Sequence, residues 1–80
     1  MKSKIRNDIA NELRSLRAKN NITLEELSKQ CNISKDAICR YENSTVSINV
    51  DNLEKILNYY NIDFCIFFNQ IYANKHNKQE

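Results

Sequence analysis

A chain of 80 residues, 41% of them apolar, with a formal net charge of +2, is the size of one small domain. It contains no glycine, which excludes a glycine-rich phosphate loop and a nucleophile elbow. The longest apolar run, residues 64–68, is far shorter than the ~20 residues of a membrane span. The polar first residues contain no apolar signal-peptide region, so we expect a cytoplasmic protein.

Charge is unevenly distributed along the chain. Residues 1–40 carry nine basic and five acidic side chains, a net charge of +4, whereas residues 41–80 carry three basic and five acidic ones, a net charge of −2. A basic N-terminal half beside an acidic C-terminal half suits a protein that faces a polyanion with one side and a partner with the other. Ordinary solvated charge is the alternative explanation of this asymmetry.

Apolar residues recur at helical spacing along almost the whole chain. The first such stripe consists of Ile5, Ile9, Leu13 and Leu16. The spacing predicts helices over residues 5–20, 24–31, 35–43 and 50–60, and a fifth helix that follows a cap at Asp63. We therefore expect an all-α fold, a single compact five-helix domain over residues 1–80, with its core at about residues 5–73 and a polar tail at 74–80.

The last element has a second interpretation. Apolar residues also alternate with period two at Ile62, Phe64, Ile66 and Phe68. Period two is the side-chain period of a β-strand, so a short extended segment is the alternative to the start of the fifth helix.

Residues 23–42 are the most informative part of the chain. Thr23 and Glu26 have the spacing of a capping box, in which the threonine oxygen accepts from the amide of residue 26 and the glutamate reaches back to the amide of residue 23. Asn32 stands where the chain must turn, and Ser34 can cap the next helix. Two helices joined by so tight a turn cross steeply, so the second projects a polar N-terminal end, as a DNA-reading element does.

Asparagine takes the place of glycine and proline at the predicted helix ends, because the chain contains neither of those residues. The asparagines at these ends are Asn21, Asn32, Asn43 and Asn61.

Neither a metal site nor an enzyme active site is expected in this chain. Cys31, Cys39 and Cys65 stand far apart, and the single histidine, His76, lies in the polar tail, so no zinc-ligand spacing is present. We expect free, mostly buried thiols, with Cys31 and Cys39 at or near core-facing positions, and neither metal nor cofactor. An enzyme is not expected either, since no nucleophile set can be assembled around His76.

Several segments follow one another in the order of a known family. They are Leu13-Arg-Ser-Leu-Arg17, Ile22-Thr-Leu-Glu-Glu-Leu-Ser28, Ile33-Ser34, Tyr41-Glu-Asn43 and Ile62-Asp-Phe64. With these segments, residue 13 to about residue 68 resembles the phage repressor and Cro type of helix-turn-helix domain, without a gap. The resemblance implies a DNA-binding domain of the repressor-like fold, and restriction–modification controller proteins are our preferred example.

The resemblance also implies roles for individual residues. Arg17 and Glu42 match a largely buried ion pair that locks the first helix to the end of the recognition helix; a phosphate contact is the alternative for Arg17. The positions that read base edges in the major groove are matched by Lys35, Asp36 and Arg40. The alternative role of Lys35 is contact with a phosphate. The alternative for Asp36 is a local one, in which the helix dipole favours its negative charge at the N-terminus. The positions that contact the DNA backbone are matched by Thr23, Leu24, Ser34, Asn43, Ser44, Thr45 and Ser47.

Two departures from the family pattern bear on DNA affinity. Leu24 stands where the family usually has a phosphate-gripping glutamine, so it keeps only the backbone amide for that contact and can otherwise pack onto a neighbour or touch a thymine methyl. The loop over residues 43–49 contains no lysine or arginine, whereas many relatives have one there. Fewer cations release fewer counterions, so we expect modest affinity per subunit and a shallow salt dependence.

The C-terminal segment suggests a partner surface. We expect Phe67 to face the core of its own subunit, which would leave aromatic and apolar side chains exposed for a homodimer. The residues assigned to this dimer interface are Phe64, Phe68, Ile71 and Tyr72. The alternative is that these side chains complete the core of the monomer.

The expected function is therefore a transcriptional regulator that binds double-stranded DNA as a homodimer, at a pseudo-palindromic operator. A rival hypothesis is a protein-interaction module, such as an antitoxin or anti-defence protein, in which the same fold holds a protein and DNA binding is secondary or absent. Binding to random and palindromic duplexes separates the two.

Overall fold

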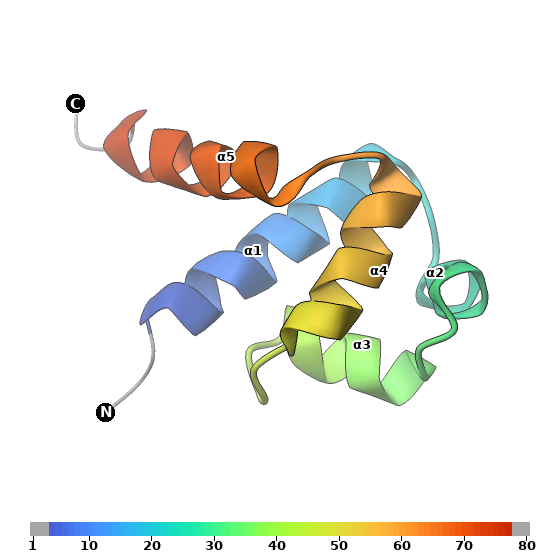
Figure 1. The fold of residues 1–80 in the computed structure, drawn as a ribbon. Helices are drawn as coiled ribbons and strands as arrows, with labels where there is room; N and C mark the ends of the chain where they lie inside the picture. Colours follow the sequence, from blue (N-terminus) through green and yellow to red (C-terminus); the bar gives the residue numbers. More distant parts are fainter. Residues whose placement is uncertain (1–3, 78–80) are drawn as a thin grey trace.

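The computed structural model describes residues 4–77, and the side chains of residues 4–73. Five α-helices make up the fold: α1 (Lys4–Lys19), α2 (Leu24–Cys31), α3 (Lys35–Glu42), α4 (Val50–Tyr60) and α5 (Phe64–Asn77) (Figure 1). The all-α prediction is confirmed. The extended alternative for residues 62–68 is wrong, because α5 begins at Phe64.

The helix ends agree with the sequence pattern to within one residue at α1 to α4. At α5 they differ, because the helix continues through Asn77 and so includes the first residues of the expected polar tail. The remainder of that tail, residues 78–80, lies outside the described residues. None of the helices in the described part of the chain has the length and apolar character needed to cross a bilayer.

Polar side chains fix where α2, α3 and α4 begin. Thr23 Oγ1 accepts from the Glu26 amide at 3.1 Å, Ser34 Oγ from the Ala37 amide at 3.1 Å, and Asn49 Oδ1 from the Asn52 amide at 2.7 Å. The capping box at Thr23 is only half formed, because the Glu26 carboxylate accepts from Gln30 Nε2 at 3.0 Å, one turn along the helix. Each side-chain cap satisfies an amide that has no partner inside the helix.

Asparagine ends three of the helices in the left-handed conformation. Asn21, Asn32 and Asn61 have φ angles of 55°, 56° and 63°. Asn43 differs, with φ −103°, and Ser44 with φ 65° makes the left-handed turn after α3. In a chain without glycine, short polar side chains are the least costly residues for this conformation.

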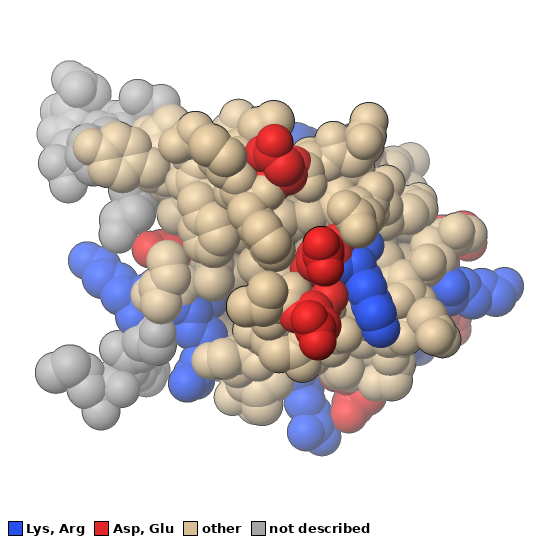
Figure 2. Space-filling model, viewed as in Figure 1, with Lys and Arg blue, Asp and Glu red and all other residues tan. Residues whose placement is uncertain are grey.

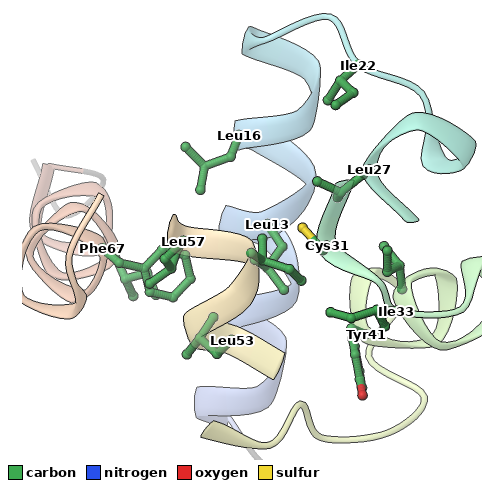
Figure 3. Packing of buried hydrophobic residues seen from close by; sticks show 13 residues of the cluster. Leu13, Leu16, Ile22, Leu27, Cys31, Ile33, Tyr41, Leu53, Leu57 and Phe67 are labelled. Atoms are coloured by element: carbon green, nitrogen blue, oxygen red, sulfur yellow. The ribbon is translucent and has the colours of Figure 1, made fainter. Parts of the chain in front are cut away.

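One apolar core joins all five helices. Helix α1 packs against α3 and α5, and α2 packs against α3 and α4. Figure 3 shows Phe67 of α5 beside Leu57 of α4, and Cys31 beside Leu27 and Leu13. Phe67 is only 1% exposed, so the prediction that it faces its own subunit's core is confirmed.

The expectation of mostly buried thiols is wrong. All three cysteines are free, but only Cys31 is buried, and Cys39 and Cys65 are exposed. Helix phase gives the reason at Cys39: the buried residues of α3 are Ile38, Tyr41 and Glu42, and Cys39 lies about 100° round the helix from Ile38, outside this buried face.

The apolar side chains of α5 are divided between core and surface differently from what the sequence predicted. Ile71 is buried at 7% exposure, and Phe64 is half-buried against the core, so the prediction that both are exposed is wrong for Ile71 and only half right for Phe64. Phe67 and Ile71 are four residues apart and therefore share the core-facing side of the helix. Phe68 and Tyr72, which follow them by one residue, remain exposed, as does Ile66.

Candidate nucleic-acid interface

The turn between α2 and α3 is held by hydrogen bonds that its own sequence supplies. Asn32 adopts the left-handed conformation, Ile33 is buried, and the Ile33 amide donates to the Ser28 carbonyl at 3.2 Å. Ser28 Oγ donates in return to the Ile33 carbonyl at 2.6 Å. These contacts fix the direction in which α3 leaves the turn.

Helix α3 has one buried face and one polar, exposed face. Ile38, Tyr41 and Glu42 form the buried face. The exposed face carries all three of the predicted base-reading side chains, together with a thiol that the sequence analysis had placed toward the core: Lys35, Asp36, Cys39 and Arg40. The spacing of residues 36, 39 and 40 by three and four positions was the available signal that Cys39 belongs to this face.

The charged residues of the exposed face form surface ion pairs within the protein. Arg40 Nη2 lies 3.2 Å from Asp36 Oδ2, and Lys35 Nζ lies 3.5 Å from Glu25 Oε2 on α2. All four side chains are more than half exposed. Exposed pairs of this kind stabilise a protein little, so their cations can exchange a carboxylate for a nucleic-acid acceptor at small cost.

A third, much less exposed ion pair holds α3 in place. Arg17 Nε and Nη2 donate to Glu42 Oε2 and Oε1 at 2.9 and 3.0 Å, and Arg17 Nη1 donates to the Ile22 carbonyl at 3.1 Å. The Glu42 side chain is 7% exposed and that of Arg17 is 26% exposed. The hydrogen bond to Glu42 is the main cause of the raised pKa of Arg17, which therefore stays charged. The pair joins α1 to the last turn of α3, and the bond to the Ile22 carbonyl ties both to the turn that precedes α2.

Arg14 adds a contact that the sequence analysis missed. Its Nη1 donates to the main-chain carbonyl of Glu42 at 2.6 Å, and its Nη2 donates to Asn11 Oδ1. The cation thus lies at the C-terminal end of α3, where the helix dipole favours a positive charge. Its position three residues before Arg17, on the same helix face, was the only sequence signal for this role.

Tyr60 lies near the Arg17–Glu42 pair. Burial is the main cause that raises its pKa to about 12; the negative charge of Glu42 acts in the same direction and the positive charge of Arg17 in the opposite one. Within the described residues, the buried Tyr60 hydroxyl has no hydrogen-bond partner. Such an orphaned hydroxyl costs stability.

The residues assigned to the DNA backbone lie at the starts of α2 and α3 and in the loop that follows α3. The Thr23 and Ser34 hydroxyls already accept from helix amides, which leaves each able to donate its proton. Leu24 is half-buried and packs against the core, one of the alternatives expected for it. Thr23, Leu24 and Lys35 line an open hollow of about 480 Å³ beside the C-terminal end of α1.

The loop over residues 43–49 makes most of its polar contacts within the protein. Thr45 Oγ1 donates to Asn43 Oδ1, Ser44 Oγ donates to Asn7 Oδ1 of α1, and Ser47 Oγ accepts from Arg6 Nε at 3.1 Å. The loop is therefore tied to the N-terminal end of α1. Sequence reasoning did not predict the two contacts to α1, which join residues 37 and 41 positions apart.

Figure 2 shows how charge is distributed on one face of the molecule. Basic atoms, in blue, lie along the lower and left edges, beneath α3 and near the N-terminal end of α1, and also at the right edge beside α2, with acidic atoms among them at the lower edge. Acidic atoms, in red, gather over α4 together with a basic side chain. In the part of the chain that the structure describes, no group of three His, Cys, Asp or Glu side chains is placed to hold a metal ion.

Comparisons with solved structures show the same fold. Two mutants of the restriction–modification controller protein C.Esp1396I superpose with TM-scores of 0.84 and 0.86, both at 19% identity. The first match covers 92% of this chain and 94% of that chain, and the second covers 94% and 97%. The clp gene regulator ClgR from Corynebacterium glutamicum superposes with a TM-score of 0.84 at 16% identity, covering 99% of this chain and 84% of its own. No curated protein matches the chain.

The family is shown by the sequence itself. Residues 13–67 match the family model described as Helix-turn-helix, and this range is more than half of the 80-residue chain. It contains α2, α3 and α4 entirely. The chain therefore belongs to the helix-turn-helix family, and its fold is that of the family's DNA-binding regulators.

Proposed function

We propose that the protein is a sequence-specific transcriptional regulator that binds a pseudo-palindromic operator as a homodimer, with α3 in the major groove. The observation that carries this proposal is the exposed face of α3. Its charged side chains project outward from a helix whose opposite face is buried and held by the Arg17–Glu42 pair. A rigid helix with a polar outer face is what reading base edges requires.

The side chains of this face have the chemistry of base recognition. The planar guanidinium of Arg40 can donate two hydrogen bonds to O6 and N7 of one guanine, and Lys35 can donate to the same acceptors. Asp36 can accept from a cytosine amino group, or it can keep Arg40 oriented through their 3.2 Å pair. Each good bidentate contact discriminates between bases by about 1–3 kcal/mol.

Contacts to the DNA backbone come from the rim of the same surface. The hydroxyls of Thr23 and Ser34 and the amide of Leu24 lie at the starts of α2 and α3, where helix N-termini favour anions. The loop groups Asn43, Ser44, Thr45 and Ser47 offer neutral donors. Contacts of this kind set the register of the protein on the duplex without reading sequence.

The dimer is proposed to form through the outer side of α5. Phe68 and Tyr72, four residues apart on one side of the helix, are 38% and 62% exposed there and give an apolar surface that a second copy can cover. A twofold pairing would place two α3 helices about one DNA turn (~34 Å) apart. Ile71 has no direct part in this interface because it is buried within the subunit.

Selection of bound duplexes from a random DNA pool tests the function. We expect enrichment of an inverted repeat, because a twofold dimer presents the same reading surface to each half-site. Failure to bind any duplex, random or palindromic, even at low salt would contradict DNA binding. That result would instead favour the rival protein-interaction role, as in an antitoxin or anti-defence protein.

A further inference from the structure

We propose that Arg6, in the N-terminal turns of α1, supplies a phosphate-binding cation for the loop over residues 43–49. This inference rests on the proposed DNA-binding function and adds a residue to its backbone contacts. It concerns a part of the chain, residues 4–12, that precedes the residues matched by the family model.

The first observation is that polar contacts join these N-terminal turns to the loop. Arg6 Nε donates to Ser47 Oγ at 3.1 Å, and Ser44 Oγ donates to Asn7 Oδ1. Figure 1 shows the N-terminal end of α1 beside the loop that connects α3 to α4. Ser44 and Ser47 are two of the residues proposed to contact the DNA backbone, so Arg6 lies next to the expected position of a phosphate.

The second observation is that apolar side chains support the same junction. A hollow of about 210 Å³ lies between the two segments, and it is lined by Ile5, Arg6, Ile9, Tyr41, Val46, Ser47 and Ile48. Ile9 and Ile48 also pack against the main core. The junction is therefore anchored to the body of the domain, which holds the Arg6 stem in a defined place.

The third observation is the composition of the loop. Residues 43–49 contain no lysine or arginine, so their own contacts to phosphate can only be neutral hydrogen bonds. A positive charge beside Ser47 attracts a phosphate whatever hydrogen bonds the guanidinium makes inside the protein. The bond to Ser47 also leaves the serine hydroxyl able to donate its proton to a phosphate oxygen.

Salt dependence of binding is the property that this cation controls. Each neutralised phosphate contributes a slope of about −0.9 to log Kobs against log salt, so loss of one contact per subunit makes the slope of a dimer shallower by about 1.8. A residue that only supports the fold lowers affinity without changing the slope in this way.

The experiment compares the wild-type protein with Arg6→Gln, Arg6→Lys and Lys55→Gln on a duplex obtained by the selection described above. Binding is measured across a series of salt concentrations, after each variant has been shown to melt like the wild type. Arg6→Gln is expected to give the shallower slope, and Arg6→Lys to keep the wild-type slope because it keeps the charge. Lys55, exposed on α4 outside the proposed interface, is the control, and its replacement should leave the slope unchanged.

A wild-type slope in Arg6→Gln would overturn the inference, as would an equally shallow slope in Arg6→Lys. If Arg6→Gln does not melt like the wild type, Arg6→Met takes its place, since it keeps an unbranched apolar stem at the junction. Failure of the proposed function has a different signature, because the wild-type protein would then bind no duplex at all.

Discussion

Arg17 and Glu42 form a two-bond ion pair, with Nε–Oε2 and Nη2–Oε1 distances of 2.9 and 3.0 Å, that joins α1 to the last turn of α3. The carboxylate is almost fully buried and the guanidinium is one quarter exposed. Because Arg14 donates to the main-chain carbonyl of the same glutamate, the end of α3 is held by two cations of α1. The orientation of the reading face therefore depends on Glu42.

Glu42→Ala should destabilise the domain by about 3–5 kcal/mol, because it leaves the Arg17 charge partly buried without its partner. Urea unfolding measures the free energy of unfolding. The double variant Arg17→Met with Glu42→Leu should lose less than Glu42→Ala, since no uncompensated charge remains. The control Asp36→Ala breaks an exposed pair and should cost roughly 0–1 kcal/mol. Equal losses in Glu42→Ala and Asp36→Ala would contradict the role given to the buried pair.

Three free cysteines, one buried and two exposed, allow a chemical footprint without any mutation. Cys39 and Cys65 are both exposed in the single subunit, and Cys39 should react quickly with a maleimide. Cys31 should react slowly, because burial raises the pKa of its thiol and reduces the thiolate fraction. Operator DNA should protect Cys39 on α3, as read by mass spectrometry of the labelled peptides, whereas Cys65, which shares the outer side of α5 with Phe68 and Tyr72, should be no better protected with DNA than in the free dimer. Protection of Cys65 alone would place the DNA on the wrong side of the molecule.

Tyr60→Phe should increase the free energy of unfolding at neutral pH, because it removes a buried hydroxyl that has no partner within the described residues. Tyr59→Phe is the matched control: Tyr59 is 41% exposed, so its replacement should change stability little. Thermal melting of the two variants against the wild type gives the comparison. A loss of stability in Tyr60→Phe would show that the hydroxyl has a partner.

The same tyrosine should make stability depend on pH in the alkaline range. Its pKa is raised by burial from 10.0 to about 12, so the folded state favours the neutral phenol. This contribution is fully present below about pH 10 and is lost as the pH rises toward about 12. Between these values wild-type stability should fall more steeply than that of Tyr60→Phe, which has no ionisable group there. Parallel curves for the two proteins would contradict the shifted pKa.

Phe68→Glu combined with Tyr72→Glu should convert dimers to monomers in sedimentation experiments, because both side chains are exposed on the outer side of α5. Val50→Glu is the control, since Val50 is 69% exposed at the start of α4 and outside the proposed interface. Dimers that persist in the double variant would contradict this interface. Ile71 is unsuitable for the test, because a charge at this buried position would damage the core.

Local sequence signals predicted most of the fold. Helix spacing and the caps at Thr23, Ser34 and Asn49 placed four helices to within one residue, because these signals act between residues three or four apart. The errors at Cys39 and Ile71 concern which side of a helix is buried. That side depends on where neighbouring helices lie, although at Cys39 the spacing from Asp36 and Arg40 did indicate the exposed face.

For the same reason, only part of the candidate site could be predicted from the sequence. Lys35, Asp36 and Arg40 were assigned by matching residues along the family pattern, and the structure places all three on the exposed face of α3. Arg6 and Arg14 were missed because long flexible side chains find partners far along the chain, at Ser47 and at the Glu42 carbonyl. Such contacts leave no periodic trace in the sequence.

The central claim is that α3 reads base edges, and selection from a random DNA pool with the wild type and Arg40→Ala in parallel tests it most directly. We expect the wild type to enrich an inverted repeat that contains a guanine in each half-site. Arg40→Ala should lose its preference for that guanine, a discrimination of about 1–3 kcal/mol, and keep the rest of the motif. Enrichment of the same motif by both proteins, or of none by the wild type, would contradict the claim.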